Sequence, residues 1–373
     1  MRIILKLSVH VIRVAVLVIG LLPDLAAASP GDIRQYQFES RPDGKGYRLI
    51  LKEVPRPVPG RHGVLVRIRA TSLNGGYDLD QLNTPPGRGP DLSGAIPLAD
   101  GAGEVIETGP EVTRFKAGDR VAGTFFERWT DGDRTPDALA SARGGNAGGM
   151  LSEVIVTSEE SLVKIPDHLS YEEGATLPTA GVTAWVGLFK YGKLQAGEYV
   201  LLKGTGGVSS FGLLFAAAAG ARPIITSSSD AKLRRAVRLG AFGTVNYRTN
   251  PEWQDQVRSM TGGIGVKQVL EVGGRETLPK ALRALAPDGH IALIGSLSGF
   301  AESIPIGLVM QAGAHLTAVY VGSRTDFEAM NVFISKHKIH PVIDRVFDFE
   351  QAPAAFDHMA NGSYMGKIVI RVD

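Results

Sequence analysis

A glycine-rich turn at the end of an apolar run holds the residues with the clearest chemical potential in this chain. The segment 200–212 reads VLLKGTGGVSSFG. The apolar residues predict a buried strand, and the residues after the glycines predict a helix start, where free amide N–H groups and the helix dipole attract a phosphate. Gly204 allows a tight turn, and Gly206 and Gly207 carry no side chain that would block a phosphate. Ser209 is small enough for close packing of this helix on the strand.

The residues after this turn continue as a βαβ unit. A glycine turn alone can be an ordinary connection between a strand and a helix, so its context decides what it does. We expect an alanine-rich helix over 211–219, a short strand over 223–226 and an amphipathic helix over 231–239 that ends at Gly240. A unit of about 30 residues is typical of dinucleotide-binding folds, and it predicts a doubly wound parallel sheet.

The end of the second strand indicates which dinucleotide is preferred. In dinucleotide sites an acidic residue there usually holds the adenine-side ribose, but this chain has Ser227 and Ser228, with Lys232 nearby. A carboxylate would repel a 2′-phosphate, whereas hydroxyl and ammonium groups would bind it. The sequence therefore favours NADPH over NADH. Tyr247, after a strand expected over 243–246, could stack on the adenine or could lie in an exposed loop.

Further motifs lie at ordered spacings outside this unit. Together with the glycine turn, they are similar to the medium-chain dehydrogenase/reductase superfamily, and most similar to its zinc-free quinone oxidoreductase branch. The resemblance covers the chain from near Arg34 to Val372. Its motifs are LADGAGEVIETG at 98–109, FKAGDRV at 115–121, ATSLN at 70–74, GATLPTAGVTAW at 174–185, LEVGG at 270–274 and GKIV at 366–369.

This resemblance implies an α/β fold with two domains and a ligand cleft between them. A Rossmann-type doubly wound parallel sheet is expected over 163–319, and a strand-rich GroES-like catalytic domain over 33–162 and 320–373. The alternating residues 63–69, GVLVRIR, are typical of a strand in the catalytic domain. The resemblance also implies a homodimer that pairs through the strand near 315–321.

The resemblance further implies a set of site residues along the cleft. Asn74 would line its active part, and Tyr77 could donate a hydrogen bond to the oxygen of the acceptor. Each of these roles has a simpler alternative. Asn74 could be a turn residue that closes a strand, and the loop 295–297 could be an ordinary strand exit. Lys367 could be a strand lysine that faces the solvent. The residues expected to contact the cofactor are Thr183, Gly204, Thr205, Gly206, Gly207, Val208, Ser227, Ser228, Lys232, Tyr247, Gly295, Ser296, Leu297, Ser323 and Lys367.

Departures from the family pattern bear on the mechanism. Zinc-dependent members carry a Cys near 72–74 and a Gly-His-Glu motif, where this chain has Ala99 and Asp100, and it has no Cys anywhere. A catalytic zinc needs about three protein ligands, typically Cys and His, so we expect no zinc. Without a Lewis acid, reduction of a quinone or of a conjugated C=C bond is the easier chemistry, because hydrogen-bond donors are enough to stabilise the developing charge.

The sequence therefore predicts an NADPH-dependent, metal-independent oxidoreductase. Its partner would be a small electrophilic acceptor, a quinone or an α,β-unsaturated carbonyl compound. Two alternatives stay open: an NAD(P)-dependent alcohol or aldehyde oxidoreductase that uses a proton relay, and a protein that binds NADPH without catalysis. Assays with a quinone, an enone and an alcohol would separate the two enzymes, and binding without hydride transfer would indicate the third function.

Composition and the N-terminal residues add further expectations. The chain of 373 residues exceeds one ordinary core, and its formal net charge of +2, with no basic stripe, argues against a nucleic-acid partner. Residues 1–28 have the layout of a secretory signal, with an apolar run over 14–22 and a small-residue pattern at Ala26 and Ala28. If this leader is cleaved, the mature chain is periplasmic or secreted and has no stable membrane span. Two alternatives stay open for residues 1–28: they are an uncleaved anchor, or they are a non-native leader added by a start codon placed too far upstream. Without a cleaved signal, we expect the protein in the cytoplasm.

Overall fold

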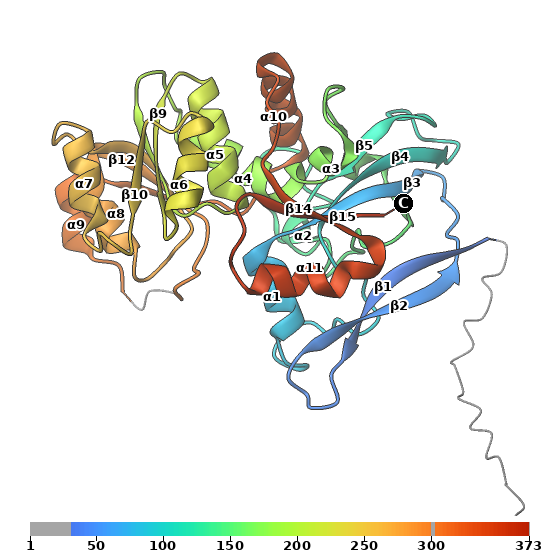
Figure 1. The fold of residues 1–373 in the computed structure, drawn as a ribbon. Helices are drawn as coiled ribbons and strands as arrows, with labels where there is room; N and C mark the ends of the chain where they lie inside the picture. Colours follow the sequence, from blue (N-terminus) through green and yellow to red (C-terminus); the bar gives the residue numbers. More distant parts are fainter. Residues whose placement is uncertain (1–30, 300–302, 373) are drawn as a thin grey trace, which may run out of the picture.

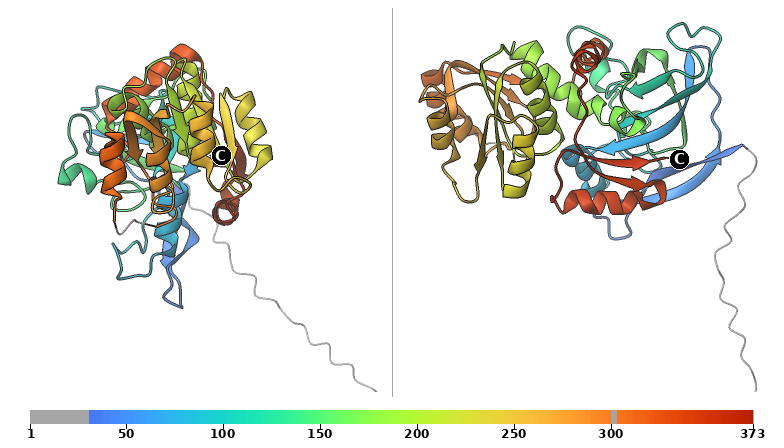
Figure 2. Two further views of the ribbon diagram at one scale, coloured as in Figure 1. Left: turned by 90° about the vertical axis from the view of Figure 1, so that its left-hand side faces the viewer. Right: turned by 45° about the horizontal axis from the view of Figure 1, so that its top comes forward.

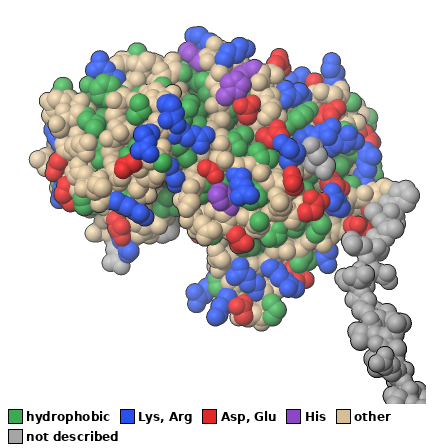
Figure 3. All heavy atoms as spheres, viewed as in Figure 1, with side chains coloured by type: hydrophobic (Ala, Val, Ile, Leu, Met, Phe, Trp, Pro, Cys, Tyr) green, Lys and Arg blue, Asp and Glu red, His purple; other side chains and the backbone are tan. Residues whose placement is uncertain are grey.

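The computed structural model describes residues 31–299 and 303–372, which form two lobes, each built on its own sheet (Figure 1). Figure 2 shows the helical segment around α4 between these two sheets. On the face in Figure 3, basic and acidic side chains are interspersed over both lobes. The predicted leader, residues 1–28, lies outside the described residues. Within the described ranges, no helix is long and apolar enough to cross a membrane.

One lobe is built on a parallel sheet with the strand order β10-β9-β8-β11-β12-β13. Its central strands are apolar and almost fully buried, which is typical of a parallel sheet covered on both faces. Helices α5 and α6 pack on one face, and α7 and α8 on the other. The predicted doubly wound sheet is confirmed. The strands are β8 (Tyr199–Leu202), β9 (Arg222–Ser227), β10 (Gly243–Asn246), β11 (Val266–Glu271), β12 (Leu285–Leu293) and β13 (His315–Ala318), and the helices are α5 (Gly207–Ala218), α6 (Asp230–Arg238), α7 (Trp253–Met260), α8 (Leu278–Ala284) and α9 (Ile306–Ala312).

The other lobe is built on a mostly antiparallel sheet with the strand order β14-β15-β3-β4-β5-β7, and β6 also pairs with β3. Strand β15, from the end of the chain, pairs with β3, so the C-terminal residues complete this lobe. The predicted strand-rich GroES-like part is confirmed, while the bounds given above for the two domains stay a prediction. The strands are β1 (Asp32–Ser40) and β2 (Tyr47–Pro55), which form a separate hairpin, and β3 (Gly63–Leu73), β4 (Asp100–Thr108), β5 (Arg120–Gly123), β6 (Val154–Ser158), β7 (Leu162–Lys164), β14 (Ile343–Asp348) and β15 (Lys367–Arg371).

The remaining helices surround this second sheet or connect the lobes. Helix α1 follows β3 directly, and this order places the residues after Leu73 at the carboxyl end of that strand. Helix α10 begins at a capping box formed by Ser323 and Asp326. The helices are α1 (Gly75–Asn83), α2 (Pro136–Leu139), α3 (Tyr171–Gly174), α4 (Val182–Trp185), α10 (Arg324–His337) and α11 (Ala352–Ala360), with π-helical turns at Leu177–Gly181 and Val186–Tyr191 and 3-10 turns at Glu159–Ser161 and Phe349–Gln351.

Helix α5 begins four residues before its predicted start. Gly206 is its N-cap with extended backbone angles, φ −75° and ψ −172°, and Gly207 already belongs to the first helical turn. The sequence predicts that Gly206 and Gly207 belong to the turn, whereas the structure has them at the N-cap and in the first turn of the helix. As a result, the first amides of α5 lie directly at the glycine turn.

Candidate functional site

The glycine turn connects β8 to α5 and leaves an open space in front of the helix. Gly204 has a φ of +74°, which favours glycine, and its N–H donates to Thr226 Oγ1 at 3.1 Å. A Cβ atom placed on Gly206 would meet no atom within 4 Å. The absence of a side chain therefore keeps a cradle free beside the amides of α5. This cradle fits the diphosphate of a dinucleotide.

Gly207 also accommodates a side chain from the other lobe. A Cβ atom at this position would lie 2.8 Å from Cδ of Lys367 and 3.1 Å from Cβ of Ala180. Glycine therefore lets the Lys367 side chain pass close to the start of α5, and the predicted contact of Gly207 with a phosphate stays a prediction.

The two lobes touch at this turn. Gly206 and Gly366 form an isolated parallel β-bridge, and the Gly366 N–H donates to the Thr205 carbonyl at 2.9 Å. Strand β15 starts at the next residue, Lys367. The turn of one lobe thus sets the position of a lysine in the other lobe.

Lys367 lies at the centre of a buried cluster with Asn74, Asp100 and Thr179, which we call the Lys367 cluster. The lysine is 2% exposed. Its Nζ donates to Asn74 Oδ1 at 2.5 Å and to Asp100 Oδ2 at 3.2 Å. Asp100 Oδ1 accepts a hydrogen bond from Thr179 Oγ1 at 2.5 Å. The predicted residues Asn74 and Lys367 are thus brought together, and the ammonium group compensates the buried carboxylate of Asp100.

Asp78 lies in the first turn of α1, beside this cluster. It accepts a hydrogen bond from the Asn74 N–H at 2.5 Å, while its Oδ1 is buried and finds no partner among the described residues. Burial raises the pKa of Asp78 from 3.8 to about 7. The hydrogen bond from Asn74 lowers this pKa, but its effect is smaller than that of burial, and the charge of Asp100 adds to the rise. Asp78 can therefore hold a proton near neutral pH, next to Asn74.

Tyr77, the predicted donor to the acceptor, directs its hydroxyl at the backbone. It donates to the carbonyl of Arg143 at 2.8 Å, and its ring packs edge-on against Phe125 with centroids 5.0 Å apart. Burial raises the pKa of Tyr77, and Tyr320 adds to the rise. A contact with an acceptor would require exchange of this hydrogen bond, so the role of Tyr77 stays a prediction.

The predicted adenine-side residues lie at the carboxyl ends of β9 and β10. Ser227 is buried, and its Oγ accepts a hydrogen bond from the Ser229 N–H at 3.3 Å. Lys232, in the first turn of α6, donates to the Gly362 carbonyl at 3.4 Å. The Tyr247 side chain is exposed, and its N–H donates to the Ser227 carbonyl at 3.1 Å. The structure places Ser227 and Tyr247 together, and their contact with a cofactor stays a prediction.

The residues predicted to meet the nicotinamide lie on α4 and on the loop after β12. Thr183 is buried in α4. A Cβ atom on Gly295 would lie 2.8 Å from the Val272 carbonyl oxygen, so this loop packs closely on the loop after β11. Leu297 donates its N–H to the same carbonyl at 3.3 Å and leaves its side chain 75% exposed. These loops share the sheet edge of the glycine turn, which is where a parallel α/β sheet binds ligands.

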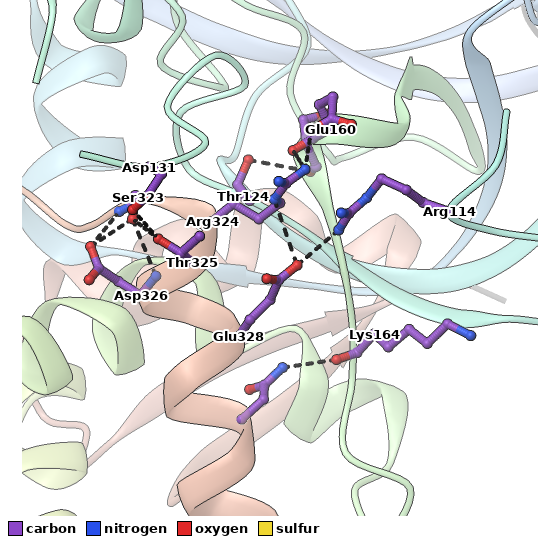
Figure 4. A network of polar contacts seen from close by, with 12 residues as sticks. Arg114, Thr124, Asp131, Glu160, Lys164, Ser323, Arg324, Thr325, Asp326 and Glu328 are labelled. Carbon is purple, nitrogen blue, oxygen red and sulfur yellow. Dashed lines mark hydrogen bonds and ion pairs between the residues drawn. The ribbon is translucent and has the colours of Figure 1, made fainter. Parts of the chain in front are cut away.

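A network of polar contacts ties α10 to the strand-rich lobe (Figure 4). Arg324 forms ion pairs with Glu160 and, at 3.6 Å, with Glu328 on the next turn of the helix. Ser323, a predicted cofactor contact, caps α10, and its hydroxyl donates to the Asp326 carboxylate at 2.8 Å. The Ser323 hydroxyl thus has a structural partner, and its contact with a cofactor stays a prediction.

Three residues of this region were not assigned a role from the sequence. Asp100 was considered only as a replacement for a metal ligand, although a carboxylate at the start of an apolar strand signals a buried charge that needs a cation. Thr179 offered no such signal, because its partner Asp100 lies 79 residues away in the chain. Asp78 bonds to the nearby Asn74, but its burial, which raises its pKa, depends on the packing of α1 against the rest of the lobe. In the part of the chain that the structure describes, no group of three or more His, Cys, Asp and Glu side chains could hold a metal ion.

Comparison with known proteins assigns this geometry to a family. Residues 60–167 match the family model described as an alcohol dehydrogenase GroES-like domain, and residues 207–336 match a zinc-binding dehydrogenase model. A zinc-type alcohol dehydrogenase-like protein of Schizosaccharomyces pombe is 41% identical over 336 residues, which cover 86% of this chain and 94% of the relative. The chain belongs to the medium-chain dehydrogenase/reductase superfamily.

Other relatives in this superfamily carry two kinds of names. The structure of a putative alcohol dehydrogenase from Sinorhizobium meliloti matches with a TM-score of 0.84 and 38% identity, covering 91% of this chain and 99% of the other. A quinone oxidoreductase of Pseudomonas aeruginosa is 33% identical over 272 residues, which cover 72% of this chain and 76% of the relative. This medium-chain dehydrogenase/reductase is therefore an oxidoreductase with both quinone oxidoreductase and alcohol dehydrogenase-like relatives.

Replacing Lys367 by Met tests the charge balance of the Lys367 cluster. The free energy of unfolding should fall by about 3–5 kcal/mol, because Asp100 loses its cation while it stays buried. Urea denaturation measures this loss. The double variant Lys367→Met/Asp100→Asn should recover much of it, since no buried charge is left unpaired. An equal loss in both variants would show that the ion pair does not cause the effect.

Replacing Asp78 by Asn tests the proton held at α1. Because the pKa of Asp78 is raised from 3.8 to about 7 in the folded chain, the folded state keeps a proton that the unfolded state releases. Asp78 therefore contributes less stability as the pH rises from about 4 to about 7. Relative to the wild type, Asp78→Asn should gain on the order of 1–4 kcal/mol between about pH 4.5 and pH 8. Denaturation curves across this range check the gain, and a constant difference between the two proteins would contradict it.

Proposed function

We propose that this oxidoreductase reduces a quinone or an α,β-unsaturated carbonyl compound with NADPH and without a metal. The observation that carries the proposal is the Lys367 cluster. Positions 99 and 100, which carry the His and Glu of the Gly-His-Glu motif in zinc-dependent members, are Ala99 and Asp100 here, and Asp100 is bonded to the Lys367 ammonium. A cation that is part of the chain thus stands beside the glycine turn and Asn74.

The residues of the site supply binding, hydrogen-bond donors and a proton. When bound, the reduced dinucleotide would supply a hydride to the acceptor, and one proton completes the reduction. The amides at the start of α5 would hold the diphosphate. An ammonium group has three N–H donors. Lys367 uses two of them for its hydrogen bonds to Asn74 and Asp100, so a third donor is left. This donor can meet a developing oxyanion or a phosphate, and Asp78 can hold a proton next to Asn74.

Two findings on relatives support the choice of acceptor and keep a second candidate. Quinone oxidoreductases occur among the relatives, including the 33% identical protein of Pseudomonas aeruginosa. The 41% identical relative carries an alcohol dehydrogenase-like name, which favours alcohol or aldehyde conversion as the second candidate. Without a Lewis acid, alcohol oxidation lacks a route to the alkoxide, so we place quinone and enone reduction first.

Hydride transfer to a panel of acceptors tests this function. We expect NADPH oxidation with a quinone or an enone, at an unchanged rate after treatment with a chelator, and little reaction of NADP⁺ with a primary alcohol. The control is Gly206→Val, which should fold, since its Cβ meets no atom within 4 Å, but should not bind NADPH because the side chain fills the cradle. Gly60→Val, also in open space, should behave as the wild type. Binding of NADPH without any hydride transfer would favour a non-catalytic protein.

Replacing Ser227 by Asp tests the preference for NADPH. A carboxylate at this buried position should repel the 2′-phosphate and weaken NADPH binding by on the order of 1–3 kcal/mol. NADH, which lacks this phosphate, should bind as well as before or better. Fluorescence titration with both dinucleotides measures the difference. Unchanged NADPH affinity would mean that this loop does not contact the 2′-phosphate.

We also propose that two copies of the chain pair through β13. This strand is last in the order of its sheet, so one of its edges is available. Helix α9, which precedes this strand in the chain and packs against β12, carries exposed apolar residues, with Ile306 66% and Met310 77% exposed. Exposed apolar side chains next to a sheet edge support an interface between two copies. Size-exclusion chromatography with light scattering gives the oligomeric state.

A further inference from the structure

A buried ion pair lies beneath the glycine turn, apart from the Lys367 cluster. Strands β8 and β11 are parallel neighbours, with Leu202 opposite Leu270. The next residues, Lys203 and Glu271, therefore stand side by side at the carboxyl edge of the sheet, and Lys203 directly precedes Gly204. Lys203 Nζ lies 3.4 Å from Glu271 Oε2.

The charged groups of this pair are buried, and residues of α7 and α8 surround the ammonium. Lys203 is 5% exposed and Glu271 is fully buried. From α7, the neutral ring of Trp253 faces the ammonium, with Nζ 4.1 Å from the ring centroid. Lys280, on α8, is the other charged group that interacts electrostatically with the Lys203 ammonium. A buried ion pair seldom stabilises a fold more than apolar residues of the same size, so packing alone does not explain this pair.

Glu271 also organises the loops on the nicotinamide side. Its Oε1 accepts hydrogen bonds from the Gly273 N–H at 2.7 Å, the Gly274 N–H at 3.2 Å and the Thr277 hydroxyl at 2.6 Å. The loop after β11 is bonded in turn to the loop after β12, where Ser298 donates its N–H to the Gly273 carbonyl at 2.7 Å. The ion pair thus connects the residue before the glycine turn to both loops.

We propose that Lys203 is a positioning residue for the dinucleotide, whose buried positive charge strengthens binding of the diphosphate at the adjacent turn. This inference rests on the proposed dinucleotide binding. Lys203 directly precedes Gly204, so its side chain starts next to the turn. Its ammonium lies at the carboxyl edge of the sheet, beside Glu271 and on the face that α7 covers, whereas α5 packs on the other face. In a poorly solvated interior, a charge acts on an anion across this edge far more strongly than in water.

The proposal makes binding depend on pH in a defined direction. Burial lowers the pKa of Lys203 from 10.5 to about 8, although Glu271 raises it, and Lys280 adds to the lowering. Above this pH the ammonium loses its proton. The pair then loses one positive charge, so binding of the anionic dinucleotide weakens as the pH rises. Conversely, a bound diphosphate should raise the pKa of Lys203 and cause uptake of a proton.

Calorimetric titration of the full chain with NADPH tests this prediction. The Kd should rise about tenfold between about pH 7 and pH 9.5, as expected if binding raises the Lys203 pKa by one unit. At about pH 8.5, titrations in two buffers of different ionisation enthalpy should show uptake of a fraction of a proton.

Two substitutions of Lys203 separate its charge from its packing. Lys203→Met should bind about tenfold more weakly at neutral pH, with no proton uptake and little change of Kd with pH. Lys203→Arg keeps a positive charge at every pH used, so its affinity should persist at pH 9.5. Lys267→Met removes a lysine from the opposite end of β11, where Nζ donates to the carbonyls of Pro287 and Asp288, and should match the wild type.

Two results overturn the proposal. The first is wild-type affinity and proton uptake in a folded Lys203→Met. The second is the same pH dependence in the wild type and Lys203→Met. If Lys203→Arg does not fold, proton uptake by the wild type and its loss in Lys203→Met still decide the question. If the wild type binds neither NADPH nor NADH at any pH, the proposed function fails first, and that failure is distinguishable from the two results above.

Discussion

The hydrogen-bonded ammonium group of Lys367 is the contact on which the rest of the site depends. It reaches Asn74 and Asp100, which belong to the strand-rich lobe, and its aliphatic stem passes the first glycine of α5 in the other lobe. A buried carboxylate without this cation would be costly, and a Cβ at Gly207 would block the approach. The position of one lysine therefore connects the charge balance of one lobe to the backbone of the other.

A second buried lysine stands on the opposite side of the same turn. Lys203 approaches from within the parallel sheet, next to Glu271, whereas Lys367 approaches from β15. Each lysine is paired with an acidic residue, so both can stay buried without adding net charge to the fold. If both lysines act as proposed, an anionic ligand at the turn is stabilised by two cations that the chain itself supplies.

Local features of the sequence predicted more of the fold than of the site. The glycine turn, the apolar strands and the amphipathic helix after Ser229 depend on residues close in sequence, and their elements lie near the predicted ranges. The pairing of Lys367 with Asn74, 293 residues apart, follows only from the return of β15 to β3. The close approach of Lys367 to Gly207 was missed for the same cause, because the side chain that this glycine accommodates comes from the end of the chain. Burial of Asp78 could not be read from a polar helix such as α1.

The transfer of a labelled hydride tests the central claim most directly. Metal-depleted protein would be mixed with NADPH that carries deuterium on one face of C4 and with a quinone or an enone, and the products would be examined by mass spectrometry. The account predicts that deuterium leaves the dinucleotide from one face only, that an enone product carries it at carbon, and that the rate matches that of untreated protein. Loss of transfer on metal depletion, with recovery on adding zinc, would contradict the account.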